Sequence, residues 1–187
     1  YKLPLYVDIY HSNTEERFAL VINEEREEFE FQIPQKPSLV DFDAEKQLLG
    51  EISYDKSIDE LAFQYRNSEK FLGKFEAINY LAADTTQNKV AQAVLKEALG
   101  DSFWAIRQEA LNTFGDYRGE DAAAIVDSIV AISRNDEKSL VRADALATLA
   151  SIDADNFTQA FVNGMQDPSY AVVGAAFYGY GQTSATD

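Results

Sequence analysis

The sequence predicts an α+β multidomain fold, in which a partial antiparallel β-sandwich over residues 1–57 precedes an α-solenoid of helix pairs over residues 58–187. Two observations lead to this prediction. Apolar and polar residues alternate along the N-terminal part of the chain, which is the period of half-buried strands. From about Ile58 the period changes to 3.6, and the helical segments then recur at a nearly constant interval.

Five short strands are expected in the first part. The first is marked by apolar residues at positions 3, 5, 7 and 9, which alternate with more polar ones. The others are predicted over residues 17–23, 27–33, 38–43 and 48–53, with a hairpin turn over 23–26. Short strands separated by turns are typical of a β-sandwich, and a chain that begins inside a strand would hold only part of one.

The helical part repeats. Four segments share a small Ala followed by a large apolar residue, and a helix-capping residue type lies six positions before each of them. The segments are 74–81, 107–114, 142–149 and 173–180, and the capping positions are Ser68, Asp101, Asp136 and Asp167. Second helices are expected between them, over about 89–99, 121–134 and 157–165. In-phase units of about 33 residues, each holding two helices, predict an α-solenoid of HEAT-like helix pairs.

Charge and composition exclude several classes of function. The chain has 32 acidic and 16 basic residues and a formal net charge of −16. We therefore expect neither nucleic acid nor an anionic membrane as a partner, because both need clustered Lys and Arg. The chain has no cysteine, which excludes disulfides, thiolate metal sites and Cys nucleophiles. The sequence assigns no cellular compartment.

Catalytic residues are not indicated. His11 is the only histidine and lies in a polar turn after the first strand, so we interpret it as a solvated loop residue. A single histidine cannot form a His-Glu-x-x-His zinc helix. Residues 24–30 are an acidic run, but the glutamates in the predicted strand alternate with Phe29 and Phe31, so we interpret them as a solvent-facing strand surface rather than a calcium site. No catalytic, cofactor-binding or metal-binding residue is predicted.

Five residues are candidates for contacts with a substrate or partner. Arg107 and Arg142 hold equivalent positions in successive repeats, in phase with Lys74. Such a ladder could recognise carboxylates, but pairing with an Asp of the neighbouring repeat is the favoured interpretation. Phe177, Tyr178 and Tyr180 make the last helix apolar, whereas terminal repeats normally present a polar outer face. Either this helix meets a partner, or the chain continues into more repeats.

The junction between the two parts resembles a known family. Val40-Asp-Phe-Asp43 followed by Leu48-Leu49 resembles the last strands of the small β-sandwich domain of aminopeptidase N-like zinc metallopeptidases. Asp55-Lys-Ser57 and Glu60-Leu61 resemble the start of that family's helical C-terminal domain. The resemblance implies a parent enzyme that uses Zn²⁺, with its catalytic domain upstream of Tyr1. No zinc ligand of the family can be carried over to this chain.

Two hypotheses of function follow. The first, implied by the resemblance, is a non-catalytic C-terminal module that contacts the upstream catalytic domain, covers its active site and shapes the access of peptide substrates. A variant of this first hypothesis is a parent protein that has the shape of the peptidase but a degenerate metal site. The alternative is a stand-alone HEAT-repeat protein-interaction scaffold with no link to peptidases. In that case a protein partner would bind the concave face of the solenoid or the end formed by residues 177–180.

Overall fold

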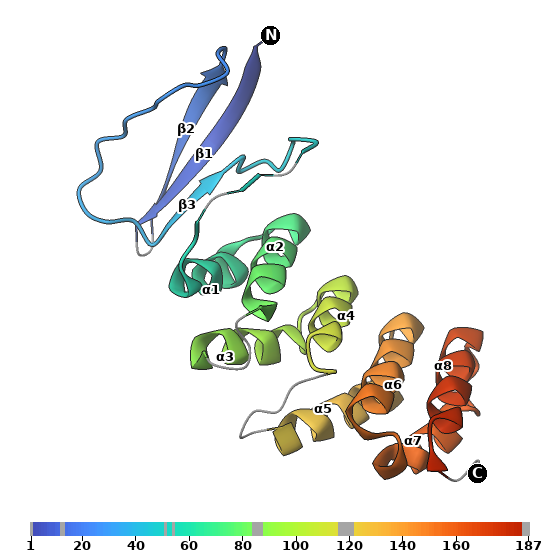
Figure 1. The fold of residues 1–187 in the computed structure, drawn as a ribbon. Coiled ribbons are helices and arrows are strands. Elements are labelled where there is room, and N and C mark those ends of the chain that lie inside the picture. Colours follow the sequence, from blue (N-terminus) through green and yellow to red (C-terminus); the bar gives the residue numbers. More distant parts are fainter. Residues whose placement is uncertain are drawn as a thin grey trace. The chain divides into compact units, whose positions relative to one another are not determined.

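The computed structural model describes residues 2–11, 14–50, 52–53, 55–83, 88–115 and 122–184. These residues form three β-strands, eight α-helices and one 3₁₀ helix (Figure 1), so the fold is α+β as predicted. The chain divides into two compact units, Tyr1–Lys74 and Phe75–Asp187. The predicted division of the chain after residue 57 stays a prediction.

The first unit contains a small antiparallel sheet. Its strands are β1 (Leu3–His11), β2 (Thr14–Ile22) and β3 (Leu39–Phe42), in the order β2-β1-β3. Val7 at the centre of β1 lies opposite Phe18 of β2 and Phe42 of β3. The alternation of the sequence sets this register, because Leu5, Val7 and Ile9 are buried together on one face.

Two of the five predicted strands are wrong. Residues 27–33 form no strand, so the hairpin predicted over 23–26 is wrong too, and the described residues of 48–53 form none either. The ring of Phe31 lies 4.8 Å from that of Phe18, measured between centroids. The segment therefore contacts β2 through side chains without a backbone ladder. An alternating pattern indicates that one side of a segment is buried and the other exposed. A segment that packs on a sheet without pairing has the same pattern, so the pattern alone does not predict a strand.

His11 is also placed differently from the prediction. It is the last residue of β1 rather than part of a solvated loop, and its side chain is buried. Neither ring nitrogen has a hydrogen-bond partner among the described residues. The strand extends two residues further than the alternation of positions 3 to 9 indicates, and it carries His11 onto the face of Ile9.

Two helices begin within the first unit. They are α1 (Ile58–Asn67) and α2 (Phe71–Ala82), and α2 contains the boundary between the units. Ser57 caps α1 in a capping box: the side chain of Ser57 accepts from the N–H of Glu60, and the carboxylate of Glu60 accepts from the N–H of Ser57. The hydrogen bonds from Ser57 to that carboxylate lower the pKa of Glu60 against the opposing effect of its desolvation.

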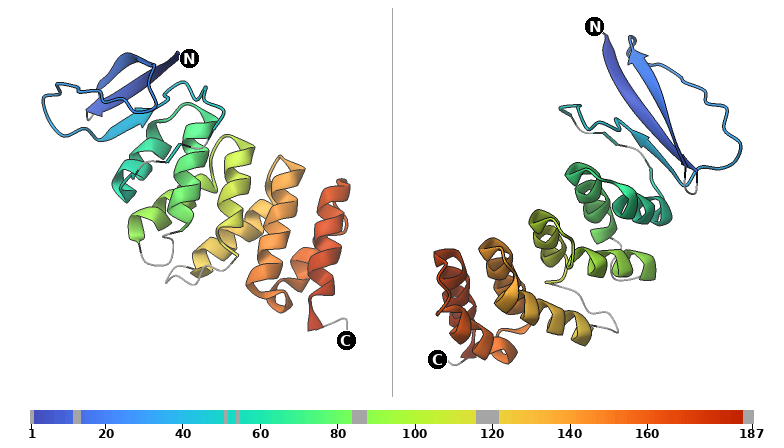
Figure 2. Two further views of the ribbon diagram at one scale, coloured as in Figure 1. Left: turned by 45° about the horizontal axis from the view of Figure 1, so that its top comes forward. Right: turned by 180° about the vertical axis from the view of Figure 1, so that it is seen from behind.

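The second unit is helical. After the end of α2, its elements are α3 (Lys89–Ala98), α4 (Trp104–Asn112), α5 (Ala122–Asn135), α6 (Ser139–Asp153), η1 (Asp155–Phe157), α7 (Thr158–Gly164) and α8 (Tyr170–Gly181). The helices predicted over 89–99, 121–134 and 157–165 are confirmed as α3, α5 and α7, except that Asp121 lies outside the described residues. Successive views show α4, α6 and α8 side by side (Figure 2).

The core of the second unit lies between these helices. Helix α6 contacts α4 and α5 on one side and α8 on the other, and α7 contacts α8. The Ala followed by a large apolar residue, which defined the repeat, is buried in α4 and α6: Ala110-Leu111 and Ala145-Leu146. The largest fully buried side chains of the unit include Phe114, Phe161, Ile106, Ile129 and Leu149. Small residues at these positions let neighbouring helices approach, and the large ones fill the space between them.

Candidate interaction surfaces

Two arginines form equivalent clamps in the second unit. The guanidinium of Arg107 donates to both carboxylate oxygens of Asp136, at 2.7 Å each, and to the carbonyl of Asp101 at 2.8 Å. Arg142 repeats this arrangement with Asp167, at 2.9 Å to each oxygen, and with the carbonyl of Asp136 at 2.7 Å. Each arginine therefore ties the loop before its own helix to the aspartate of the following helix pair.

The aspartates are fixed by the backbone as well. The side chains of Asp101, Asp136 and Asp167 accept the N–H two residues further on, at 2.8, 2.9 and 2.8 Å. These donors belong to Phe103, Lys138 and Ser169, which precede the first residues of α4, α6 and α8. The predicted capping residues thus bond to the N–H of the residue just before each helix rather than to an N–H group of its first turn. Ser68 does not share this arrangement, because its hydroxyl donates to the carbonyl of Lys70.

The clamps change the titration of their members. Burial of Asp136 opposes its ionisation, but the hydrogen bonds from Arg107 and from the Lys138 N–H outweigh it, and the pKa of Asp136 is lowered. The hydrogen bonds from Arg142 lower the pKa of Asp167 in the same way. Hydrogen bonds to these carboxylates raise the pKa of Arg107 and of Arg142. All four groups are therefore held in their charged forms near neutral pH.

The contacts agree with the interpretation of Arg107 and Arg142 as links between repeats. Their use in binding a substrate or partner stays a prediction. Lys74, the third cation in phase, lies with its Nζ 5.3 Å from the ring centre of Tyr65 within the first unit.

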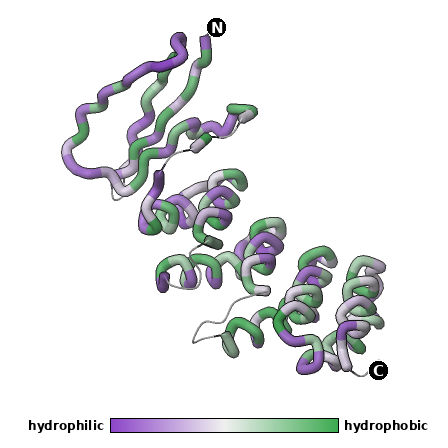
Figure 3. The backbone as a smooth tube through the Cα atoms, viewed as in Figure 1, coloured by the Kyte–Doolittle hydropathy of each residue, from purple (hydrophilic) through white to green (hydrophobic). Residues whose placement is uncertain are grey.

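The three aromatic candidates lie on α8. Phe177 and Tyr178 are exposed, by 61% and 65%, while Tyr180 is half-buried. Tyr170, at the start of the same helix, is 94% exposed. No charged residue lies between Asp167 and Asp187 in the sequence, and Figure 3 shows α8 without a strongly hydrophilic stretch. The exposed side of α8 is thus an uncharged surface with three aromatic side chains.

A second surface follows α5. A cavity of about 460 Å³ lies between α5 and the C-terminal end of α3, where Lys96, Leu99 and Gly100 form one wall. Small residues of α5 form the other wall, Ala124, Ser128 and Ala131 among them. The hydroxyl of Ser128 is already bonded to the carbonyl of Ala124. The cavity therefore offers mainly apolar contact to a ligand.

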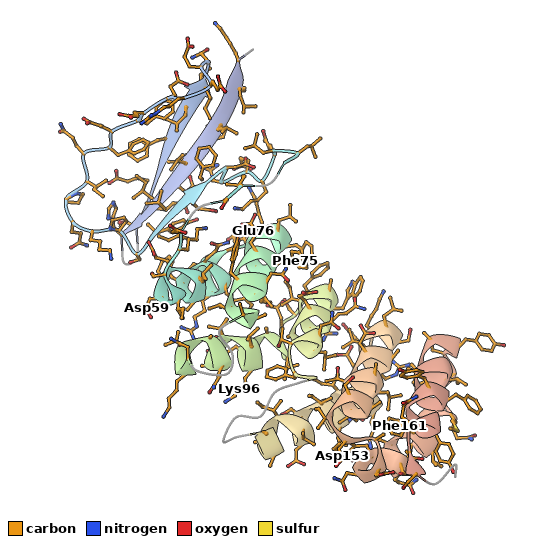
Figure 4. All side chains as sticks on the ribbon, in the orientation of Figure 1. Asp59, Phe75, Glu76, Lys96, Asp153 and Phe161 are labelled. Carbon is orange, nitrogen blue, oxygen red and sulfur yellow. The ribbon has the colours of Figure 1, made fainter. Side chains whose placement is uncertain are left out.

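A smaller cavity lies on the other side of α5. Its volume is about 280 Å³, and its walls come from α5, the end of α6 and η1, with Ile152, Asp153 and Phe157 among the lining residues. Ile125 lines both cavities. We call the two cavities together the α5 groove. Figure 4 labels Lys96 on α3 and Asp153 at the end of α6, and each is a polar residue that lines one of the two cavities.

Sequence reasoning did not find the α5 groove. The signal was present, since Ala124, Ser128 and Ala131 place small residues at helical spacing on an exposed side of α5. In the sequence, small residues were interpreted only as places where helices approach one another. On this side of α5 they instead form the wall of a cavity.

The junction segment of the first unit is a polar network. Asp41 lies 2.9 Å from the Nζ of Lys46, and Asp43 accepts the N–H groups of Gln47 and Leu48 at 3.0 and 2.9 Å. Asp43 and Lys46 have φ angles of 52° and 53°, so the chain turns sharply here. Glu45 is bonded by Lys70 at 2.6 Å, which lowers the pKa of Glu45. The residues that suggested a peptidase family thus belong to the end of β3, the turn after it and the start of α1.

The fold is similar to that of a known enzyme. Human deoxyhypusine hydroxylase, in a structure in complex with glycerol, matches with a TM-score of 0.56 and 17% sequence identity. The match covers 71% of this chain and 45% of that chain, so this chain spans less than half the length of the protein it matches. At this identity the likeness shows a shared fold alone. No family model and no curated protein sequence matches the chain.

These comparisons correct the family proposed from the sequence. The resemblance of residues 40–65 to aminopeptidase N-like enzymes is wrong, because no family model supports it and the similar solved structure is a hydroxylase. The function as a C-terminal module of a zinc aminopeptidase is wrong for the same reason. The motif residues Asp41 and Asp43 have local roles instead: Asp41 pairs with Lys46, and Asp43 accepts the N–H groups of the turn. The expected zinc and upstream catalytic domain rest on that resemblance alone.

Two further observations apply to the described part of the chain. It contains no group of three or more His, Cys, Asp or Glu side chains placed to hold a metal ion. Among the same residues, no helix has both the length and the apolar character needed to cross a membrane.

Proposed function

We propose that this chain is a protein-interaction scaffold, in which the helix pairs of residues 75–187 form a HEAT-like α-solenoid and bind a peptide segment in the α5 groove. The scaffold is the alternative hypothesis from the sequence, which placed the partner on the concave face of the solenoid or at residues 177–180 rather than in the α5 groove. The arrangement of α4, α6 and α8 side by side supports it, as do the repeated Arg–Asp clamps that join successive pairs. The fold similarity described above is consistent with it.

The observation that carries the proposal is the pair of cavities that share Ile125. Their volumes of about 460 and 280 Å³ are each sufficient for a bulky apolar side chain. Their walls supply few unpaired polar groups, so affinity would come from the burial of apolar surface. A ligand would thus place one apolar anchor on each side of Ile125.

Charge favours a basic ligand. Asp153 lines the smaller cavity, and Glu97 and Asp127 are exposed on α3 and α5, the helices that border the larger one. Among the described residues that line the two cavities, Lys96 is the one cation. The net charge of −16 adds a long-range attraction for cations. The ligand class is therefore a peptide segment with two bulky apolar residues and flanking Lys or Arg.

A peptide-display selection against the 187-residue chain tests the proposal. We expect binders with two apolar anchors and basic flanks, and calorimetry then gives their affinity. Ala131→Trp fills the larger cavity and should weaken binding at least about tenfold. Ala147→Trp makes the same change at an exposed position of α6 outside both cavities, and should leave binding within about twofold. Failure to select binders, or binders that ignore Ala131→Trp, would contradict the proposal.

A further inference from the structure

The exposed side of α8 carries a regular pattern. Tyr170, Gly174, Phe177 and Gly181 are spaced by four, three and four residues, so they lie along one stripe of the helix. All four are exposed. The stripe therefore alternates a large aromatic residue with a glycine, and no other element of the described chain covers it.

This stripe corresponds to a surface that is buried in the earlier helices. In the repeat alignment Phe177 takes the place of Leu111 in α4 and Leu146 in α6. Leu111 and Leu146 are 0% and 1% exposed, whereas Phe177 is 61% exposed. After the α4–α6 and α6–α8 contacts, α8 therefore presents an equivalent face with the same chemistry, and no described element of the chain packs on it.

No contact with the described part of the chain explains the glycines of the stripe. A Cβ atom added to Gly174 or Gly181 would meet nothing within 4 Å. At Gly179 of the same helix it would lie 2.4 Å from the ring of Phe161, so that glycine is required by the packing of α7 on α8. Glycine is the poorest helix former after proline, so Gly174 in the interior of α8 weakens the helix, while Gly181 is its last residue. Both glycines make sense if another surface approaches the helix closely at these points.

We propose that this surface is α8 of a second copy of the chain, packed antiparallel. The pairs Phe177 with Gly174 and Tyr170 with Gly181 are both centred on the same point, between residues 175 and 176. A two-fold axis at that point places each aromatic ring of one copy over a glycine of the other, and all four contacts form in one register. The stripe is thus complementary to itself, as an isologous interface must be.

Charge supports a second copy over a partner of another kind. Each copy carries −16, and the uncharged surface of α8 lets two copies approach without adding local repulsion between like charges. A basic partner would be expected to meet acidic residues, which the stripe does not have. Position 173 also differs from its equivalents Arg107 and Arg142, because it is a valine. A further repeat stacked on α8 would lack the clamp seen in the earlier pairs, whereas a second copy needs none.

Sedimentation analysis of the 187-residue chain tests the inference. We expect a dimer at about 100 μM, which dissociates on dilution. Phe177→Glu places a charge at the contact and should leave only monomer. Gly174→Ala should weaken the dimer at least about fivefold, because the added methyl group fills the space for the ring of Phe177. Since position 174 has open space in the monomer, this variant keeps its fold.

Val162→Glu is the matched control. Val162 is exposed by 40% on α7, outside the stripe, so the same substitution there should leave the dimer unchanged. A chain that stays monomeric at about 100 μM overturns the inference, and so does a dimer that survives both α8 variants. Ala131→Trp in the α5 groove should not alter the dimer, so the inference and the proposed function can fail independently.

Discussion

Arg107 and Asp136 form the more buried of the two clamps. Their side chains are 9% and 6% exposed, against 13% and 15% for Arg142 and Asp167. Burying two charges is costly, and the cost is offset only where geometry and further hydrogen bonds are good. Here Arg107 has two bonds to the carboxylate and one to each of two carbonyls, those of Asp101 and Ser102, and Asp136 also accepts a backbone N–H. The pair therefore fixes how one helix pair is placed on the next.

Removal of one member should be strongly destabilising. Arg107→Met keeps much of the apolar volume but leaves Asp136 buried without its partner, and it should lower the free energy of unfolding by about 3 kcal/mol. Arg142→Met should cost less, because that clamp is more exposed. Arg134→Met, at an exposed arginine of α5, is the control and should change the free energy by less than about 0.5 kcal/mol. Urea denaturation at pH 7 measures all three.

The pH dependence distinguishes a lost clamp from a general packing defect. The pKa of Asp136 is lowered in the folded chain, so its contribution is present above the ordinary pKa of aspartate and is lost as pH falls through the folded value. The difference between Arg107→Met and the unaltered chain should therefore shrink as pH is lowered from about 4. A difference that stays constant over this range would assign the loss to packing instead.

At the scale of elements, the helices were easier to predict than the strands. A period of 3.6 sustained over a whole helix, with Ala110-Leu111 and Ala145-Leu146 at equivalent places, allows few other structures. Residues 27–33 alternate as clearly as β1 does, yet they form no ladder. Pairing depends on which segments lie beside a strand, and a local pattern does not contain that information.

Of the candidate surfaces, too, one could be predicted from the sequence and the other could not. The aromatic residues Phe177 and Tyr178 stood out because an apolar helix end is unusual, and they are exposed. The α5 groove was not predicted, since it arises from the spacing of three helices rather than from any one of them. The family resemblance failed because a short acidic motif such as Asp41-Phe-Asp43 also suits a strand end followed by a tight turn.

Two glycines of α8 give opposite predictions for the same substitution. Gly174→Ala should raise the free energy of unfolding by about 0.5–1 kcal/mol, because alanine is the better helix former and the site is open. Gly179→Ala should lower it by about 1–3 kcal/mol, because the methyl group would meet the fully buried ring of Phe161. Thermal unfolding at a concentration too low for self-association measures both. Equal effects at the two positions would contradict this description of α8.

At the scale of the whole molecule, the two proposed surfaces share no residue. The α5 groove is lined from α3, α5, α6 and the segment around η1, and the stripe belongs to α8 alone. Figure 1 shows α3 and α8 at different places along the second unit. A dimer formed through α8 would carry two grooves, and a ligand with two binding segments would then gain affinity by occupying both.

Salt should stabilise this dimer, whereas it weakens an interface held by ion pairs. Two chains of −16 repel each other, and the stripe contributes no charge to oppose that repulsion. Raising the salt concentration from about 0.1 to 1 M shortens the screening length from about 10 to 3 Å and removes most of the repulsion. The dissociation constant of the dimer should therefore fall, by at least about threefold, as sedimentation at several NaCl concentrations would show. Phe177→Glu should stay monomeric throughout. A dimer that dissociates as salt rises would be held by ion pairs, and the contact would then lie outside α8.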